Sequence, residues 1–231
     1  MDNSTRWLDY GPDEYAGVTW DNTGDRRIFL GWMSNWLYAA QVPTTAWRSA
    51  MTIPRELRLI DYKGRLLVAS APTNELNRIG GKTTLYNNIS LKNPFDLQSR
   101  LVNLSGQCIL KIETNTPESF SAELSNGKNE NVTIGYDKKT NQYYIDRTRS
   151  GIVNFNEDFG SRSIAPRLSA SKTIQLTLVV DKASVEVFAD GGSTVMTGIF
   201  FPTETLNRIS IRSAQNLVLK SLSYTPLKSI W

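Results

Sequence analysis

The amino-acid sequence predicts an all-β protein, because strand-like alternation, frequent turns and little helical periodicity all indicate the same class. Apolar and polar residues alternate in residues 173–180 (TIQLTLVV), 184–189 (SVEVFA) and 208–212 (RISIR). Turn sequences such as Asp190-Gly191-Gly192 separate these segments. Many short strands divided by such turns are typical of a β-sandwich, a barrel or a propeller.

A change in composition predicts a domain boundary near residue 72. Five of the six tryptophans lie in the first 50 residues. Residues 1–72 contain enough strand-like segments for one blade of a β-propeller, and a single blade cannot bury both of its faces. The predicted strands of this part are residues 15–20, 27–34, 51–60 and 65–70.

The rest of the chain predicts a linker and a second domain. Residues 73–81 form the predicted short helical linker, in which Thr73 or Asn74 caps the helix and Gly80-Gly81 ends it. Residues 82–231 are long enough for a two-sheet β-sandwich with its own core. The predicted fold is therefore a partial propeller followed by a sandwich.

The composition excludes several kinds of chemistry and partner. The 231 residues contain no histidine and one cysteine, Cys108, so they offer no His-assisted nucleophile, no cysteine-rich metal site and no internal disulfide. The net charge is +4 and the basic residues are scattered, which is not typical of a nucleic-acid binder. No apolar run approaches the roughly 20 residues of a membrane span. The first residues lack the features of a signal peptide, so the protein is cytosolic or its export signal lies outside this sequence.

The first 60 residues contain the densest group of candidate binding residues. Asp9, Asp13 and Glu14 lie close together in the sequence, and Trp32 and Trp36 follow. If the strand continues through residue 36, both tryptophans lie on one of its faces. Indole rings beside amides and carboxylates suit a sugar, whose C–H face stacks while its hydroxyls form hydrogen bonds. The alternative is that the tryptophans belong to the core and the acids cap a turn.

Several motifs follow one another along the chain. In the first part they are Asp9-Tyr10-Gly11-Pro12-Asp13-Glu14-Tyr15-Ala16, Gly31-Trp32-Met33-Ser34-Asn35-Trp36, Pro43-Thr44 with Trp47-Arg48, and Met51-Thr52-Ile53-Pro54-Arg55-Glu56-Leu57. In the second part they are Gly135-Tyr136-Asp137, Tyr144-Ile145-Asp146-Arg147-Thr148 and Val185-Glu186-Val187-Phe188. In this order they resemble the C-terminal part of glycoside hydrolase family 32, the levanases, exo-inulinases and invertases that cleave β-fructosides.

The resemblance implies a five-bladed propeller that carries the active site, followed by a β-sandwich. Residues 1–72 would be the last blade and the end of the preceding one. The implied activity is retaining hydrolysis of fructans by an extracellular or periplasmic enzyme that needs no cofactor and no metal. The family's catalytic carboxylates lie in Trp-Met-Asn-Asp-Pro-Asn-Gly, Arg-Asp-Pro and Glu-Cys-Pro motifs, and none of these occurs here. We therefore expect no catalytic residue in this stretch and no activity from it alone.

The resemblance also implies roles for individual residues. Trp36 would line the fructose-binding subsite, with Asn35 and Tyr38 nearby, or it would pack between two blades. Asp9 and Asp13 would orient substrate hydroxyls, bridge to a neighbouring blade or cap a turn.

Other side chains are expected to be structural. We expect Trp32 in the core and Glu186 on a solvated strand surface. We expect Arg55 to pair with Glu56 or with another acid nearby.

Two further functions remain open from the sequence. The chain could be a non-catalytic module that binds fructan or fructo-oligosaccharides weakly, or a structural remnant that docks with a partner chain. The blade face in residues 15–60 should be apolar. We therefore expect a homo-oligomer formed through residues 1–60, or contact with an N-terminal propeller half.

Overall fold

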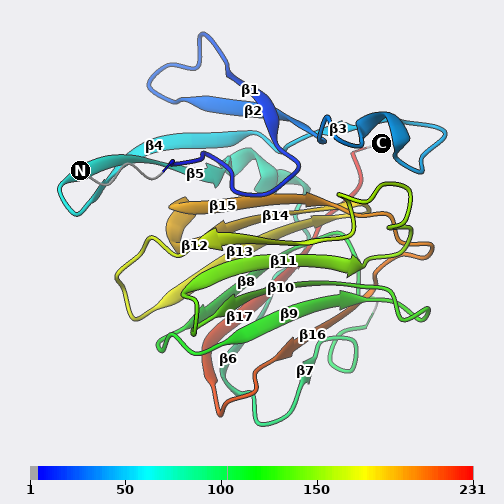
Figure 1. The fold of residues 1–231 in the computed structure, drawn as a ribbon. Coiled ribbons are helices and arrows are strands. Elements are labelled where there is room, and N and C mark those ends of the chain that lie inside the picture. Colours follow the sequence, from blue (N-terminus) through cyan, green and yellow to red (C-terminus); the bar gives the residue numbers. More distant parts are fainter. Residues whose placement is uncertain (1–4, 103, 231) are drawn as a thin grey trace.

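The computed structural model describes residues 5–102 and 104–230, and it confirms an all-β protein. Three antiparallel sheets make up the described chain, one of five strands and two of six (Figure 1). The five-stranded sheet lies across one edge of the two larger sheets, next to strand β15 (Thr194–Ile199). The C-terminal end returns to the same side of the molecule.

The first sheet has the strand order β1-β2-β4-β5, and β3 pairs with β2. Its strands are β1 (Tyr15–Thr19), β2 (Ile28–Met33), β3 (Ala50–Met51), β4 (Arg55–Tyr62) and β5 (Arg65–Pro72). The predicted strand 51–60 is divided in two, because Pro54 has no N–H to donate to a ladder. Lys63 and Gly64 both have positive φ, which gives the tight β4–β5 hairpin its two-residue turn.

A 3-10 helix, η2 (Asn74–Ile79), follows the first sheet where the sequence predicts a short helix. Gly80 directly after it pairs with Leu227 near the end of the chain. The connecting segment is therefore tied to the last strand of the protein, β17 (Val218–Pro226).

The two larger sheets contain the remaining strands, in the orders β12-β11-β10-β9-β16-β7 and β15-β14-β13-β8-β17-β6. The first consists of β7 (Phe95–Asp96), β9 (Phe120–Ser125), β10 (Asn131–Asp137), β11 (Gln142–Arg149), β12 (Arg162–Pro166) and β16 (Arg208–Arg212). The second adds β6 (Thr84–Ser90), β8 (Cys108–Thr114), β13 (Ile174–Asp181) and β14 (Ser184–Ala189) to β15 and β17. A short 3-10 helix, η3 (Asp190–Gly192), connects β14 to β15.

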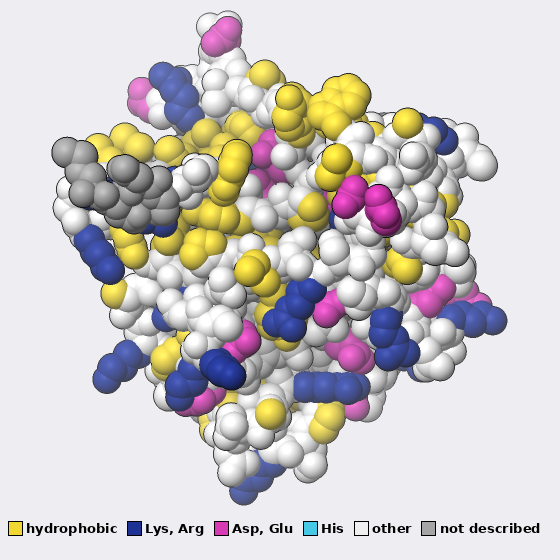
Figure 2. Space-filling view, in the orientation of Figure 1, with side chains coloured by type: hydrophobic (Ala, Val, Ile, Leu, Met, Phe, Trp, Pro, Cys, Tyr) yellow, Lys and Arg dark blue, Asp and Glu magenta, His cyan; other side chains and the backbone are white. Residues whose placement is uncertain are grey.

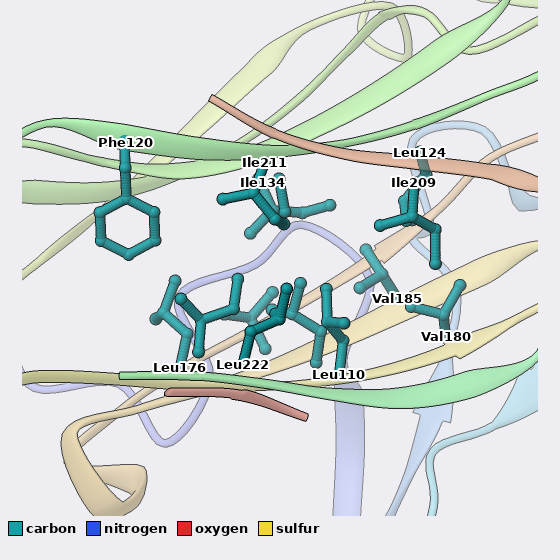
Figure 3. Packing of buried hydrophobic residues seen from close by; sticks show 14 of the residues in the cluster. Leu110, Phe120, Leu124, Ile134, Leu176, Val180, Val185, Ile209, Ile211 and Leu222 are labelled. Carbon is teal, nitrogen blue, oxygen red and sulfur yellow. The ribbon is translucent and has the colours of Figure 1, made fainter. Parts of the chain in front are cut away.

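These two sheets face each other across one hydrophobic core. Ile134 and Ile209 of one sheet point toward Leu110 and Leu222 of the other (Figure 3), and all four side chains are fully buried. Alternation with period two places the apolar residues of β9 on the inner face. Each fully buried side chain of this size stabilises the fold by about 1.5–3 kcal/mol relative to exposure.

Residues 9–13 cover the free edge of β15, which is otherwise the last strand of its sheet. The N–H of Tyr10 donates to the carbonyl of Val195, at 2.8 Å. A Cβ at Gly11 would lie 2.2 Å from the backbone of Thr197, so only glycine allows this approach. All six residues of β15 are buried as a result. An unprotected strand edge is thereby removed.

Candidate functional site

Three aromatic rings form a cluster on the first sheet. The rings of Trp32 and Trp36 have centroids 5.1 Å apart, and Tyr15 lies 6.4 Å from each, edge-on. Trp36 is 73% exposed and Tyr15 is 54% exposed, so the cluster presents an open aromatic surface. Such a surface can stack on the C–H face of a sugar ring.

The cluster forms in a different way from the predicted one. Strand β2 ends at Met33, so Trp36 does not share a strand face with Trp32. The chain turns instead at residues 34–38 and brings the second indole back beside the first. Trp32 is half-buried in this cluster, and the prediction that it belongs to the core is therefore wrong.

Asn35 holds this turn in place. Its amide nitrogen donates to the carbonyl of Pro12, at 2.7 Å, and its side-chain oxygen accepts from the N–H of Leu37, at 2.9 Å. Both ends of the amide are therefore engaged in positioning Trp36 relative to the segment that covers β15.

Asp9 lies in a buried ion-pair network with Arg55. The guanidinium of Arg55 donates to Asp9 Oδ2 at 2.8 Å and to Glu186 Oε2 at 3.0 Å. Asp9 also accepts from the N–H of Thr197 at 2.9 Å and from the N–H of Gly11 at 2.8 Å. Asp9 thus caps the turn at residues 9–11, one of the roles expected for it, and it joins three segments of the chain.

Asp13 and Tyr38 lie in a second buried network, around Arg147. The guanidinium of Arg147 donates to Asp13 Oδ2 at 2.6 Å and to the Tyr38 hydroxyl at 2.8 Å. The Tyr38 hydroxyl donates in turn to Asp13 Oδ1, and the N–H of Ile199 donates to Asp13 Oδ2 at 2.9 Å. Burial, together with the Asp13 carboxylate, raises the pKa of the Tyr38 phenol well above its ordinary value, so it stays a neutral donor.

One expectation about the charges near Arg55 is wrong and another holds in its second form. Glu186 is only 2% exposed rather than solvated, because the first sheet covers the outer face of β14. Arg55 pairs with other acids, Asp9 and Glu186, rather than with Glu56. Glu56 instead pairs with Arg26 on the surface, at 2.9 Å.

Glu14 is a candidate residue for which sequence reasoning found no role. Its Oε1 atom is buried, and it accepts no hydrogen bond from any residue that the structure describes. Gly31 leaves room for the carboxylate, since a Cβ there would lie 2.1 Å from Oε1. Burial raises the pKa of Glu14, the Asp9 carboxylate adds to the shift and the Arg55 guanidinium opposes it. The sequence signal that could have revealed this buried acid is Gly31, which faces Glu14 across the β1–β2 hairpin.

Two models of one protein family match consecutive parts of the chain. The model of the glycosyl hydrolases family 32 N-terminal domain matches residues 1–70, and the family 32 C-terminal model matches residues 75–226. The chain belongs to glycosyl hydrolase family 32. The resemblance found in the sequence motifs is therefore confirmed.

The relatives of this family 32 chain are considerably longer than it is. It is 35% identical to a levanase of Bacillus subtilis over 239 residues, covering 99% of this chain and 35% of the levanase. It is 33% identical to an extracellular exo-inulinase of Aspergillus niger, covering 87% of this chain and 39% of that enzyme. The exo-inulinase crystal structure from Aspergillus awamori superposes with a TM-score of 0.84 at 28% identity, over 99% of this chain and 46% of that one.

The described part of this family 32 chain contains neither a membrane-spanning helix nor a cluster of metal ligands. None of the described helices is long and apolar enough to cross a membrane. Among the described His, Cys, Asp and Glu side chains, no group of three could hold a metal ion.

Proposed function

We propose that this chain is the C-terminal part of a retaining β-fructosidase that degrades fructans. The observation that carries the proposal is the family match, which covers nearly the whole chain in two consecutive models. Relatives named levanase and exo-inulinase support a fructan as substrate, and the name of the Aspergillus niger relative supports an extracellular location. The proposed enzyme needs no cofactor or metal and binds neither nucleic acid nor membranes.

We propose that residues 1–72 are the last blade of a five-bladed propeller, with the end of the blade before it. Residues 73–81 are the linker and residues 82–231 the β-sandwich. Three features support this division: the first sheet has its own strand order, two facing sheets share a separate core, and the two family models meet between residues 70 and 75.

The chain is proposed to be inactive by itself. A retaining glycosidase needs a free carboxylate nucleophile about 5–5.5 Å from a second carboxyl group that donates the proton. Among the buried acids described above, Asp9 and Glu186 are bound to Arg55 and Asp13 is bound to Arg147. Glu14 has a buried oxygen without a hydrogen bond, but a single carboxyl group cannot be both nucleophile and proton donor. The family's three catalytic motifs do not occur in the sequence.

Within this function, Trp36 is proposed to form part of the wall of the fructose-binding subsite. Its exposure and its contacts with Trp32 and Tyr15 support this role. Asn35, Tyr38, Asp9 and Asp13 are proposed to act as positioning residues, since their polar atoms bond to other parts of the chain.

The partner of the first sheet is proposed to be the rest of the propeller, or a second copy of this chain when that half is absent. Hydrophobic side chains gather over this sheet at the top of Figure 2. The largely exposed hydrophobic residues of the chain before residue 72 include Val18, Leu37, Leu59 and Leu66. An exposed apolar surface of this kind marks an interaction site.

Activity and binding assays test the proposal. The purified chain should release no fructose from levan, inulin or sucrose. Release of fructose would contradict the proposal that the chain is inactive by itself. Calorimetric titration with fructo-oligosaccharides should show weak binding that Trp36→Ala weakens further. Trp7→Ala is the matched control, because Trp7 is 64% exposed and lies outside the cluster. Equal binding by the Trp36→Ala variant would reject the subsite.

A further inference from the structure

A polar pocket lies on the outer face of the sheet β12-β11-β10-β9-β16-β7, and none of the aromatic cluster residues lines it. It has a volume of about 370 Å³. In Figure 2 basic and acidic side chains are interspersed over this face, below the first sheet. Its lining includes the side chains of Ser121, Asp137, Tyr144, Arg162 and Arg212.

One cross-strand row forms the floor of the pocket. Arg212 pairs with Ser121, Ser121 with Gly135, and Gly135 with Tyr144. A Cβ on Gly135 would lie 2.6 Å from the Tyr144 hydroxyl, so glycine leaves the space that the tyrosine side chain crosses. Beyond Gly135 the same row continues to Ser121 of β9, two strands from Tyr144, and both side chains line the pocket. This row places hydroxyl groups along the pocket.

Charged groups of both signs surround this floor with unused hydrogen-bonding capacity. The guanidinium of Arg162 lies 3.7 Å from the centre of the Tyr144 ring, and it has no hydrogen bond or ion pair with the described residues. Arg212 donates its Nε to the Ser210 hydroxyl at 3.2 Å, and one terminal nitrogen lies 3.3 Å from Glu123. Asp137 Oδ1 accepts a hydrogen bond from the N–H of Lys139, and Oδ2 remains available to a ligand.

We propose that this pocket is an accessory carbohydrate-binding site that holds a fructosyl unit of the polymer. The inference rests on the proposed function, and it adds a second place where the same substrate is held. Vicinal hydroxyls of a sugar both donate and accept, so Asp137 can accept from one hydroxyl while Arg162 donates to the next. The carboxylates of Asp137 and Glu123 beside the two guanidiniums favour a neutral polyol over an anion.

Binding to soluble levan tests this inference in the full chain carrying Trp36→Ala, which removes the first proposed sugar contact. Affinity electrophoresis in levan gels measures the retardation, with dextran gels as the polymer control. Arg162→Ala and Asp137→Asn should each weaken levan binding roughly tenfold, because each loses a charge-assisted hydrogen bond. Arg149→Ala is the matched control, since Arg149 is exposed on the same sheet but outside the pocket.

Each outcome decides the question. Loss of levan binding in the two pocket variants, with Arg149→Ala unchanged and all melting temperatures equal, supports the accessory site. Pocket variants that bind levan as tightly as their parent overturn it, and so does a parent that does not bind levan. Inorganic phosphate that binds the pocket while levan does not would make it an anion site and also overturn the inference. Sugar binding that depends on Trp36 alone would leave the proposed function intact, so the two failures are distinguishable.

Discussion

Replacement of Arg55 by methionine tests the interface between the first sheet and the two facing sheets. Arg55 is fully buried, and its guanidinium bonds to Asp9, Glu186 and the Thr197 hydroxyl. Methionine keeps much of the length and volume of the side chain but none of its charge. The variant therefore leaves two buried carboxylates without their counter-ion while changing the packing little.

The expected loss is large because both acids stay buried. Asp9 and Glu186 have side chains that are 0% and 3% exposed. Removal of one partner from a buried ion pair costs about 3–5 kcal/mol in the free energy of unfolding. Asp9 keeps its bonds from Gly11 and Thr197, and Glu186 keeps its bond from Ile53, so we expect the lower part of that range.

Urea unfolding followed by two probes measures this loss. Tryptophan fluorescence reports on the first sheet, since five of the six tryptophans lie in the first 50 residues, whereas far-ultraviolet circular dichroism reports on all three sheets. In the Arg55→Met variant the fluorescence transition should move to lower urea and separate from the other. Arg26→Met removes a partly exposed arginine with two acid partners and should change stability far less. A loss of under about 1 kcal/mol for Arg55→Met would refute the reasoning.

Three further predictions concern single side chains. The pKa of Glu14 is raised in the folded protein, so its contribution to stability is present below the unfolded value of 4.5 and is lost as the pH rises through the folded value. Glu14→Gln should therefore raise the melting temperature at pH 7 but not near pH ~4, and a lower melting temperature at pH 7 would contradict this. Gly11→Ala should destabilise the fold by about 1–3 kcal/mol in urea unfolding, because its Cβ would meet Thr197. Gly127→Ala is its control, with no atom closer than 3.7 Å, and equal losses would reject the close approach. Burial raises the pKa of Cys108 to about 12, so the native thiol should not react with Ellman's reagent at pH ~8 until urea unfolds the chain.

The strands could be predicted from the sequence because their signals are local. The alternation in β14 and the Lys63-Gly64 turn arise from residues next to one another in the chain. The division between β3 and β4 was missed, although Pro54 supplied a local reason for it.

The environment of the candidate site could not be predicted in the same way, because it depends on contacts between distant segments. The alternation in β14 correctly places Glu186 on the face that points away from the core of the two larger sheets. The pattern is local, however, and cannot show that the first sheet covers that face. Asp9 bonds to Thr197, 188 residues further along the chain. The two acids around Gly11 have the composition of an ordinary turn, and only the edge of β15 shows why they are buried.

The position of the exposed aromatic cluster depends on residues of the two facing sheets. Trp36 lies two residues before Tyr38, whose hydroxyl bonds to Asp13 and to Arg147 of β11. Arg55 of the first sheet reaches in the opposite direction, to Glu186 of β14. Because each arginine is fully buried and bonds to polar groups of more than one segment, both networks form only when the sheets occupy one relative position. Residues on both sides of the interface between the first sheet and the two larger sheets therefore hold the surface that presents Trp36. Substitution of either arginine should displace this surface before it disturbs the shared core of the larger sheets.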